Sequence, residues 1–297
     1  MKTILAFLLC CTMTCPIYAG NMLNFQAGQK AAYTVHQDAN VAMKSENGNV
    51  SIHSNSILGF TVEVLKIDST THSFPIEVEV NVTQLKIDEN IKLPFNEIAV
   101  QYNSYRAKDN PVSLQKIVAK LMKKPLQFTI NENYKVEETT GRLEAFEDHF
   151  DDKTSVIPTG ANGFMFRVLL GQIFHLVGQK DSQKAYNVSS YPLARWDEDI
   201  STSSFSSDFE IVDKTEYTIG KSTATAIYGS WKGKAQLCCD WEETKSNLTI
   251  DGNIAWNKAN PLVQARDILF KIDQKDISSD PVSLHAKIHQ KWSSKGL

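Results

Sequence analysis

The chain has 297 residues, of which 42% are hydrophobic and 22% are charged, and its 31 basic residues nearly balance its 34 acidic residues. This composition is typical of a globular protein that can bury a substantial core, as one large domain or two small ones. The basic residues are mixed with the acidic ones along the chain, which argues against a nucleic-acid-binding protein.

The first 19 residues have the pattern of a signal peptide. Lys2 supplies a positive charge, residues 4–11 (ILAFLLCC) are apolar, and Ala19 is a small residue at the expected cleavage position. We therefore expect residues 1–19 to be removed and residues 20–297 to be exported to the periplasm or cell envelope, with secretion as an alternative. An uncleaved anchor helix is disfavoured because the apolar run is too short to span a bilayer. A lipid anchor at Cys10 or Cys11 stays open, since residues 8–11 faintly resemble a lipobox.

Only two of the five cysteines, Cys238 and Cys239, follow the predicted signal peptide, and they are adjacent. A disulfide between neighbours would close a strained ring, and in a strand the two side chains would point to opposite faces. We therefore expect apolar packing, not disulfides, to hold the fold. The redox state of this pair stays open.

Alternating apolar residues predict strands in the N-terminal half. The polar segment 36–56 contains Asn47-Gly48, a strong hairpin-turn signal. The clearest alternation covers residues 75–87, but the parity of its apolar positions changes after Thr83. Because a shift by one residue turns every following side chain to the other face, we predict a bulge near Thr83-Gln84. The alternation itself favours an antiparallel sheet with one solvated face.

The remaining elements are predicted from shorter patterns. Residues 88–110 are interpreted as loop, and the segments 112–122 and 142–150 as helices. In the C-terminal half, Asp251-Gly252-Asn253 predicts a hairpin turn between two short strands. Residues 266–272 are interpreted as the last strand before a C-terminal tail.

The most apolar run after the signal peptide is Phe164–Val177 (FMFRVLLGQIFHLV). Its apolar residues recur with the spacing of one helix face, so we predict an amphipathic helix that packs on a sheet built from both flanking halves. The run is too short and too polar to span a membrane. A curved sheet closed by a helix encloses an apolar space. We expect a ligand there to contact the apolar residues of the helix, and Arg167 and His175, on the opposite stripe, to meet either its head group or solvent. The candidate ligand-binding residues are Phe166, Arg167, Leu169, Leu170, Ile173 and His175.

Three segments resemble a family of exported, β-rich bacterial envelope proteins and lipoproteins of unknown function. They are residues 23–35 (LNFQAGQKAAYTV), 125–141 (PLQFTINENYKVEETTG) and 191–196 (YPLARW). The third departs from the family pattern, which usually has Gly-Asp where this chain has Ala194-Arg195 before Trp196. The resemblance implies an envelope location and mostly antiparallel β structure, and it carries no known activity.

No motif predicts catalysis, a cofactor or a metal. His285 and His289 have the spacing of a metal-binding pair on a helix, but they lack the glutamate of a zinc-protease helix, so we expect two exposed polar residues. The acidic segment 147–152 does not fit a calcium-binding loop. The chain has no nucleophile elbow, phosphate loop or dinucleotide fingerprint, although paired carboxylates far apart in sequence leave no local mark.

The sequence thus predicts a mainly β fold with a few helices, in which antiparallel, curved sheet is covered by a central amphipathic helix. The fold is one domain or two packed halves, about 20–137 and 190–297, joined by a helical segment 138–180. The favoured function is non-enzymatic binding of a lipid or other apolar ligand, with peripheral membrane association as a further option. The alternative is a structural or interaction component of the envelope that contacts another envelope protein, and an exported hydrolase has the least support. The oligomeric state stays open.

Overall fold

A computed structural model provides the structure of this chain. The residues that it describes are 25–45, 48–68, 73–106, 115, 119, 122–131, 136–140, 169–171, 173–174, 186–188, 195–198, 205–208, 210–211, 215–238, 244–276 and 283–297.

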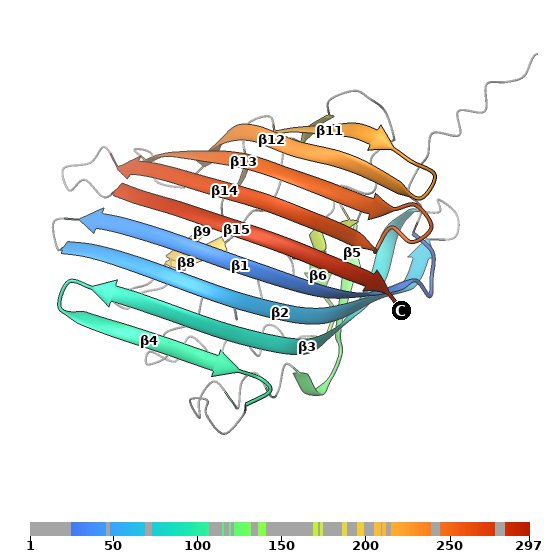
Figure 1. Cartoon of the computed structure of the whole chain (residues 1–297), viewed down its shortest axis with the longest axis horizontal. Coiled ribbons are helices and arrows are strands. Elements are labelled where there is room, and N and C mark those ends of the chain that lie inside the picture. Colours follow the sequence, from blue (N-terminus) through green and yellow to red (C-terminus); the bar gives the residue numbers. More distant parts are fainter. Residues whose placement is uncertain are drawn as a thin grey trace, which may run out of the picture.

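Most of the described residues belong to one broad antiparallel sheet of thirteen strands (Figure 1). In the N-terminal part these are β1 (Lys30–Ser45), β2 (Gly48–Asp68), β3 (Ser73–Leu93), β4 (Asn96–Asn103), β5 (Leu126–Ile130) and β6 (Val136–Glu138). In the C-terminal part they are β7 (Tyr186–Val188), β10 (Glu210–Ile211), β11 (Thr215–Ser222), β12 (Ala226–Cys238), β13 (Thr244–Asn257), β14 (Gln264–Asp276) and β15 (Ser283–Gly296). Two further strands, β8 (Arg195–Glu198) and β9 (Phe205–Asp208), form a separate pair. The predicted mainly β, antiparallel fold is confirmed.

The first and last strands of the sheet are neighbours at its centre. β1 pairs with β15 along almost its whole length, from Ala31 opposite Gly296 to Lys44 opposite Ser283. From β1 the sheet continues through β2 to β3, and from β15 it continues through β14, β13 and β12 to β11. Strands far apart in the sequence therefore share one sheet. The predicted division into two halves stays a prediction.

The bulge predicted in the third strand is confirmed. Between β2 and β3 the pairing jumps from Gly59 opposite Gln84 to Phe60 opposite Val82, so Thr83 is the extra residue. A Cβ atom on Gly59 would lie 2.9 Å from Gln84 Cβ, which is closer than real Cβ atoms come to other atoms. A glycine is therefore needed opposite the bulge. A bulge bends and twists its strand. On its two sides β3 has different partners, β5 before it and β4 after it.

Two turn predictions have opposite outcomes. The hairpin predicted at Asn47-Gly48 is confirmed, since β1 and β2 pair up to Ser45 opposite Gly48. The hairpin predicted at Asp251-Gly252-Asn253 is wrong, because these residues lie within β13. Gly252 faces Trp231 on one side and Ile268 on the other, and a Cβ there would lie 3.0 Å from Ile268 Cγ1. This glycine makes room for side chains in a continuous strand.

Two segments interpreted as irregular are strands. Residues 88–110, predicted as loop, contain the end of β3 and all of β4. The C-terminal tail predicted after residue 272 contains β15, which lies at the centre of the sheet. Apolar and polar residues alternate only weakly in both segments, because polar side chains also occupy buried positions, such as Glu89 and Gln290. The predicted helices 112–122, 142–150 and 164–177 lie mostly outside the described residues.

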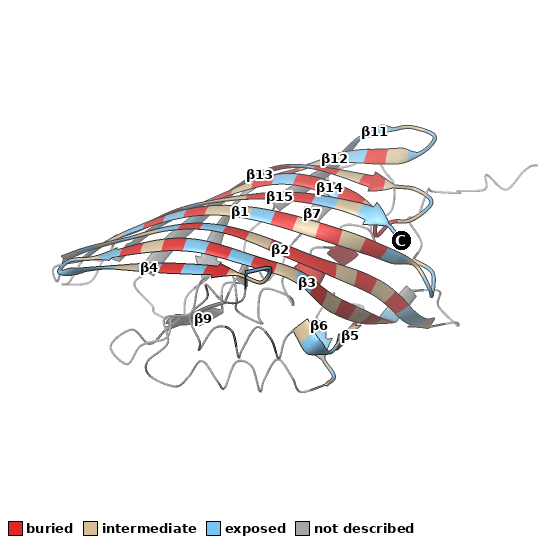
Figure 2. Ribbon diagram, turned by 60° about the horizontal axis from the view of Figure 1, so that its bottom comes forward, coloured by how far each residue is buried: buried red, intermediate tan, exposed pale blue. Residues whose placement is uncertain are grey.

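The sheet has two unlike faces, which Figure 2 shows as buried and exposed residues alternating along the long strands, such as β1, β2 and β3. We call the face that carries Tyr33, Phe60 and Trp292 the inner face, because its residues form the core. The outer face carries the intervening polar residues, including His36 and Asn40. We call the end of the sheet with the β1–β2 and β3–β4 turns, at the left in Figure 1, the distal end. The opposite end, with Leu297, is the proximal end.

Candidate functional site

The proximal part of the inner face is a closed aromatic core. The ring of Tyr33 stacks on Phe60 with 5.0 Å between centroids and meets the Trp292 ring edge-on at 6.5 Å. The described residues of the predicted central helix have helical backbone. Their side chains, among them Ile173 and Phe174, have no exposed surface. Phe174 contacts Phe25, with ring centroids 4.6 Å apart. This region is therefore filled by the protein itself.

A charged residue is buried beside this core. Arg266, on β14, is 3% exposed, and its Nε and Nη2 both donate to Oε1 of Gln264. The guanidinium also lies 4.8 Å above the centre of the Trp292 ring. The amide of Gln264 in turn donates to the carbonyls of Ile173, at 3.2 Å, and Pro261, at 2.8 Å. The amide dipole and the aromatic face help to compensate a charge that has left water.

Tyr33 is polar and equally buried. Its hydroxyl donates to the carbonyl of Leu262, which lies in the connection between β13 and β14. Burial raises the pKa of the Tyr33 phenol well above its ordinary value, and the positive charge of Arg266 opposes this shift only in part. The neutral phenol therefore ties the centre of the sheet to the β13–β14 connection.

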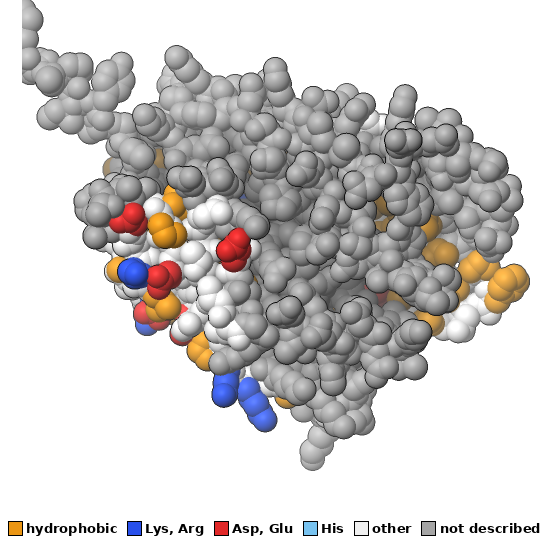
Figure 3. All heavy atoms as spheres, turned by 180° about the vertical axis from the view of Figure 1, so that it is seen from behind, with side chains coloured by type: hydrophobic (Ala, Val, Ile, Leu, Met, Phe, Trp, Pro, Cys, Tyr) orange, Lys and Arg blue, Asp and Glu red, His pale blue; other side chains and the backbone are white. Residues whose placement is uncertain are grey.

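The inner face carries buried polar residues in its middle, among them Ser54, Glu89 and Gln290. Towards the distal end it is apolar again but less covered. We call the apolar inner-face residues of this end the distal apolar face; they are Val41, Met43, Val50, Ile52, Ile91, Leu93, Ile272, Leu284 and Ala286. None of them belongs to the hydrophobic core cluster of the described residues, which contains Tyr33, Phe60 and Trp292. Met43, Val50, Leu93 and Leu284 are only half-buried. Figure 3 shows hydrophobic side chains gathered at this end of the molecule, at the right of that view.

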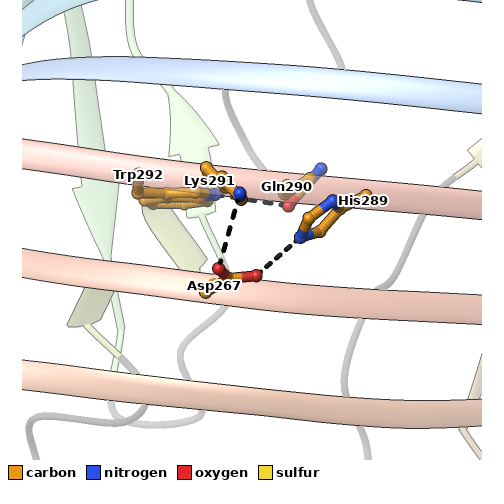
Figure 4. Close-up of polar contacts among 5 residues, drawn as sticks. All are labelled: Asp267, His289, Gln290, Lys291 and Trp292. Atoms are coloured by element: carbon orange, nitrogen blue, oxygen red, sulfur yellow. Dashed lines mark hydrogen bonds and ion pairs between the residues drawn. The ribbon is translucent and has the colours of Figure 1, made fainter.

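The outer face is polar and rich in histidine. His285 Nδ1 lies 2.6 Å from Asp273 Oδ1, and His289 Nε2 lies 2.6 Å from Asp267 Oδ1. Lys291 Nζ also approaches Asp267, at 3.9 Å (Figure 4). In the same figure, Trp292 Nε1 donates a hydrogen bond of 3.4 Å to Gln290 Oε1. These two residues flank Lys291 on β15. The side chains of successive β15 residues thus lie on opposite faces of the sheet.

An open hollow of about 670 Å³ lies over the outer face near the distal end. The small side chains of Ala42 and Ser51 lie next to each other within it, where β1 pairs with β2. Longer polar residues line its sides, including Lys92, Lys271 and Lys287. The hollow reflects the difference in side-chain length on a flat, solvated surface.

The sequence-predicted site residues have different outcomes. Leu169, Leu170 and Ile173 are fully buried in the core cluster, so the described structure makes them part of the protein's own packing. Their contact with a ligand stays a prediction, and so does the intact central helix. Phe166, Arg167 and His175 lie outside the described residues, as do Cys10, Cys11, Cys239 and the acidic segment 147–152.

His285 and His289 lie on a strand and not on a helix. Four residues of strand separate them by about 13 Å, too far for one metal ion, and each contacts its own aspartate. Among the described residues no group of three or more His, Cys, Asp or Glu side chains could hold a metal. Among the same residues, no helix has the length and apolar character needed to cross a membrane.

Sequence reasoning missed the distal apolar face and the buried pair of Arg266 and Gln264. The signal for the first was present, since residues 41, 43, 50 and 52 are apolar at alternate positions on both sides of a turn. It was obscured by the polar residues around it. For Arg266 the local sequence offers no sign that an arginine faces inward.

No family model matches the chain, and no curated protein matches it. Among solved structures it is similar to lipovitellin, in a structure concerned with lipid–protein interactions, with 11% identity and a TM-score of 0.51. That match covers 92% of this chain and 26% of the lipovitellin chain, so this chain spans about a quarter of that protein's length. An outer membrane channel from Pseudomonas putida F1 matches over 93% of this chain and 98% of that chain, with 8% identity and a TM-score of 0.21. The lipovitellin match shows a similar fold, and the second match is too weak to support an argument.

Proposed function

We propose that this protein binds a lipid or other apolar ligand against the distal apolar face of its large sheet. The observation that carries the proposal is the partial exposure of this face. The apolar residues of the proximal core are buried, whereas Met43, Val50, Leu93 and Leu284 keep accessible apolar surface. Apolar surface gathered at one place on a folded protein marks an interaction site. The fold similarity to lipovitellin, a protein studied for its lipid–protein interactions, supports the same assignment.

The binding energy would come from burial of apolar surface. Each 100 Å² of acyl chain removed from water contributes about 2.5 kcal/mol. The half-buried residues of the distal apolar face form a row across β3, β2, β1 and β15, from Leu93 through Val50 and Met43 to Leu284. Such a row offers one apolar track, which suits an extended chain. No covalent chemistry is involved.

We also propose that the protein acts outside the cytoplasm, in the cell envelope. The signal-peptide pattern of residues 1–19 supports this location. The resemblance of segments 23–35 and 125–141 to exported envelope proteins points the same way.

The first experiment is native mass spectrometry of the protein purified without detergent. We expect extra mass that organic extraction removes and that is identified as lipid. The delipidated protein is then titrated with a fluorescent fatty acid. Val50→Asp, which places a carboxylate on the distal apolar face, should weaken binding about tenfold or more, the equivalent of about 1.4 kcal/mol.

A matched control lies on the same strand. Ile57 is half-buried but faces outward, between His36 on β1 and Lys86 on β3. Ile57→Asp should leave fatty-acid affinity unchanged. Equal losses in the two variants, or a wild-type protein that carries no lipid and binds no probe, would overturn the proposal and favour a structural role.

A further inference from the structure

The turn between β3 and β4, at the distal end, carries an aromatic residue fully exposed to solvent. Phe95 is 98% exposed, the largest value among the described large hydrophobic residues that are exposed. Leu93 and Asn96 pair across the turn, which places Phe95 at its tip. A phenylalanine kept in water forgoes the free energy of burial. Such a side chain at the tip of a hairpin is placed to enter an apolar layer.

The β3–β4 turn packs against the start of β2. Gly48, the first residue of β2, has a φ angle of 121°, and a Cβ atom there would lie 2.5 Å from Pro94 Cγ. Gly48 therefore packs closely on the residue that precedes Phe95. On the other side, the backbone N–H of Glu97 donates to Asn96 Oδ1 at 2.8 Å. Two neighbouring hairpins thus present Phe95 from a defined position.

The surroundings of Phe95 combine apolar groups with two lysines, one of which, Lys92, lies opposite Glu97 across the β3–β4 hairpin. Behind it on the inner face lie Leu93 and Val50 of the distal apolar face. On the outer face of the same end, Lys44 and Lys92 are exposed, and neither forms an ion pair within the described part of the chain. Some lysines elsewhere on this face have acidic partners, as Lys30 has with Glu63 at 2.7 Å. Others, including Lys271 and Lys287 near the same end, form no ion pair within the described residues either. Two unpaired lysines beside a protruding phenylalanine are complementary to anionic head groups above an acyl layer.

We propose that the distal end of the sheet docks on the surface of an anionic lipid bilayer. Phe95 enters the boundary between head groups and acyl chains, and Lys44 and Lys92 contact lipid phosphates. The bilayer then lies at the open end of the distal apolar face, where a lipid can pass between membrane and protein. This last step rests on the proposed function, whereas the docking itself rests on Phe95 and the lysines.

The test is flotation of the full chain with vesicles of phosphatidylglycerol and phosphatidylcholine. Phe95→Ser should reduce the bound fraction, with a partition coefficient about tenfold lower. Tyr105→Ser is the matched control, because Tyr105 is 70% exposed but follows β4 at the end away from the turn. It should float as the wild type does. All variants share residues 1–24, so any contribution of the N-terminal segment cancels.

A second variant tests the charges. Lys44→Gln with Lys92→Gln should reduce binding to anionic vesicles about thirtyfold, the equivalent of about 1 kcal/mol for each lysine, and leave binding to pure phosphatidylcholine unchanged. Added salt should weaken wild-type binding in the same way. Flotation of Phe95→Ser at the wild-type level, or failure of the wild type to float, would overturn the docking proposal.

Fatty-acid binding in solution separates this proposal from the proposed function. Phe95→Ser should bind the fluorescent fatty acid with wild-type affinity, because its side chain is outside the distal apolar face. A wild type that binds the fatty acid but no vesicles refutes only the docking. A wild type that binds vesicles but no fatty acid refutes only the ligand site.

Discussion

Tyr33 permits a sharp test of how the centre of the sheet is held together. Its ring packs on Phe60 and its hydroxyl donates to the carbonyl of Leu262. Tyr33→Phe keeps the ring and removes only the hydroxyl. A typical intramolecular hydrogen bond contributes about 1 kcal/mol. We therefore expect the variant to lose about that much stability at neutral pH, because Ser294 Oγ still reaches the same carbonyl at 3.3 Å.

The pH dependence gives the stronger prediction. In the unfolded chain the phenol ionises with a pKa of about 10, while in the folded protein burial raises the pKa of Tyr33 well above this value. The stabilising contribution of Tyr33 is therefore fully present below pH 10 and is lost as the pH rises towards the folded pKa. From the linkage relation, the loss is about 0.4 kcal/mol at pH 10 and about 1.4 kcal/mol at pH 11.

Urea unfolding followed by circular dichroism measures this loss. The wild type should be about 1 kcal/mol more stable than Tyr33→Phe at about pH 8, the two should be equally stable at about pH 10.6, and the wild type should be about 0.4 kcal/mol less stable at about pH 11. Other groups that titrate in this range, including Tyr102, whose pKa burial also raises, are common to both proteins. A difference between the two proteins that stays constant with pH would show that Tyr33 ionises normally and that the reasoning is wrong.

Three further substitutions test the packing of the sheet. Trp231→Ala should cost about 3–5 kcal/mol, because this ring is fully buried and meets Phe270 edge-on at 5.8 Å; a loss of thermal stability no larger than that of a surface variant would contradict it. Gly252→Val should lower the free energy of unfolding by about 1–3 kcal/mol, because the valine overpacks against Ile268. An unchanged midpoint of guanidinium unfolding would contradict this, since it would mean that the strand can adjust. His289→Ala should cost about 1 kcal/mol or less, because its contact with Asp267 is partly exposed; a larger loss in chemical unfolding would mean that the outer-face contacts matter more than their exposure suggests.

The predictions that the structure confirms depend on local backbone rules. A change of apolar parity within residues 75–87 requires an extra residue somewhere, whatever the rest of the fold, and the structure has it at Thr83. The hairpin at Asn47-Gly48 follows in the same way from glycine's freedom to adopt positive φ, and Gly48 has a φ angle of 121°.

The predictions that proved wrong depend on neighbours that the local sequence does not specify. Gly252 resembles a turn residue until Trp231 and Ile268 are placed on either side of it. The segment after residue 272 resembles a polar tail until β15 is placed between β1 and β14. In each case only the partner strands decide the structure.

The sequence by itself determined the class of fold, antiparallel β with one apolar and one polar face, because alternation has a period that a strand alone satisfies. It also determined the bulge in the third strand and the first hairpin. Only the tertiary structure decided that the first and last strands meet at the centre, that Arg266 faces inward, and that the apolar face is closed at one end and accessible at the other. The first of these features is pairing between residues more than 200 positions apart, such as Val35 and Trp292, which no local pattern encodes. The other two depend on how the neighbouring strands and segments pack.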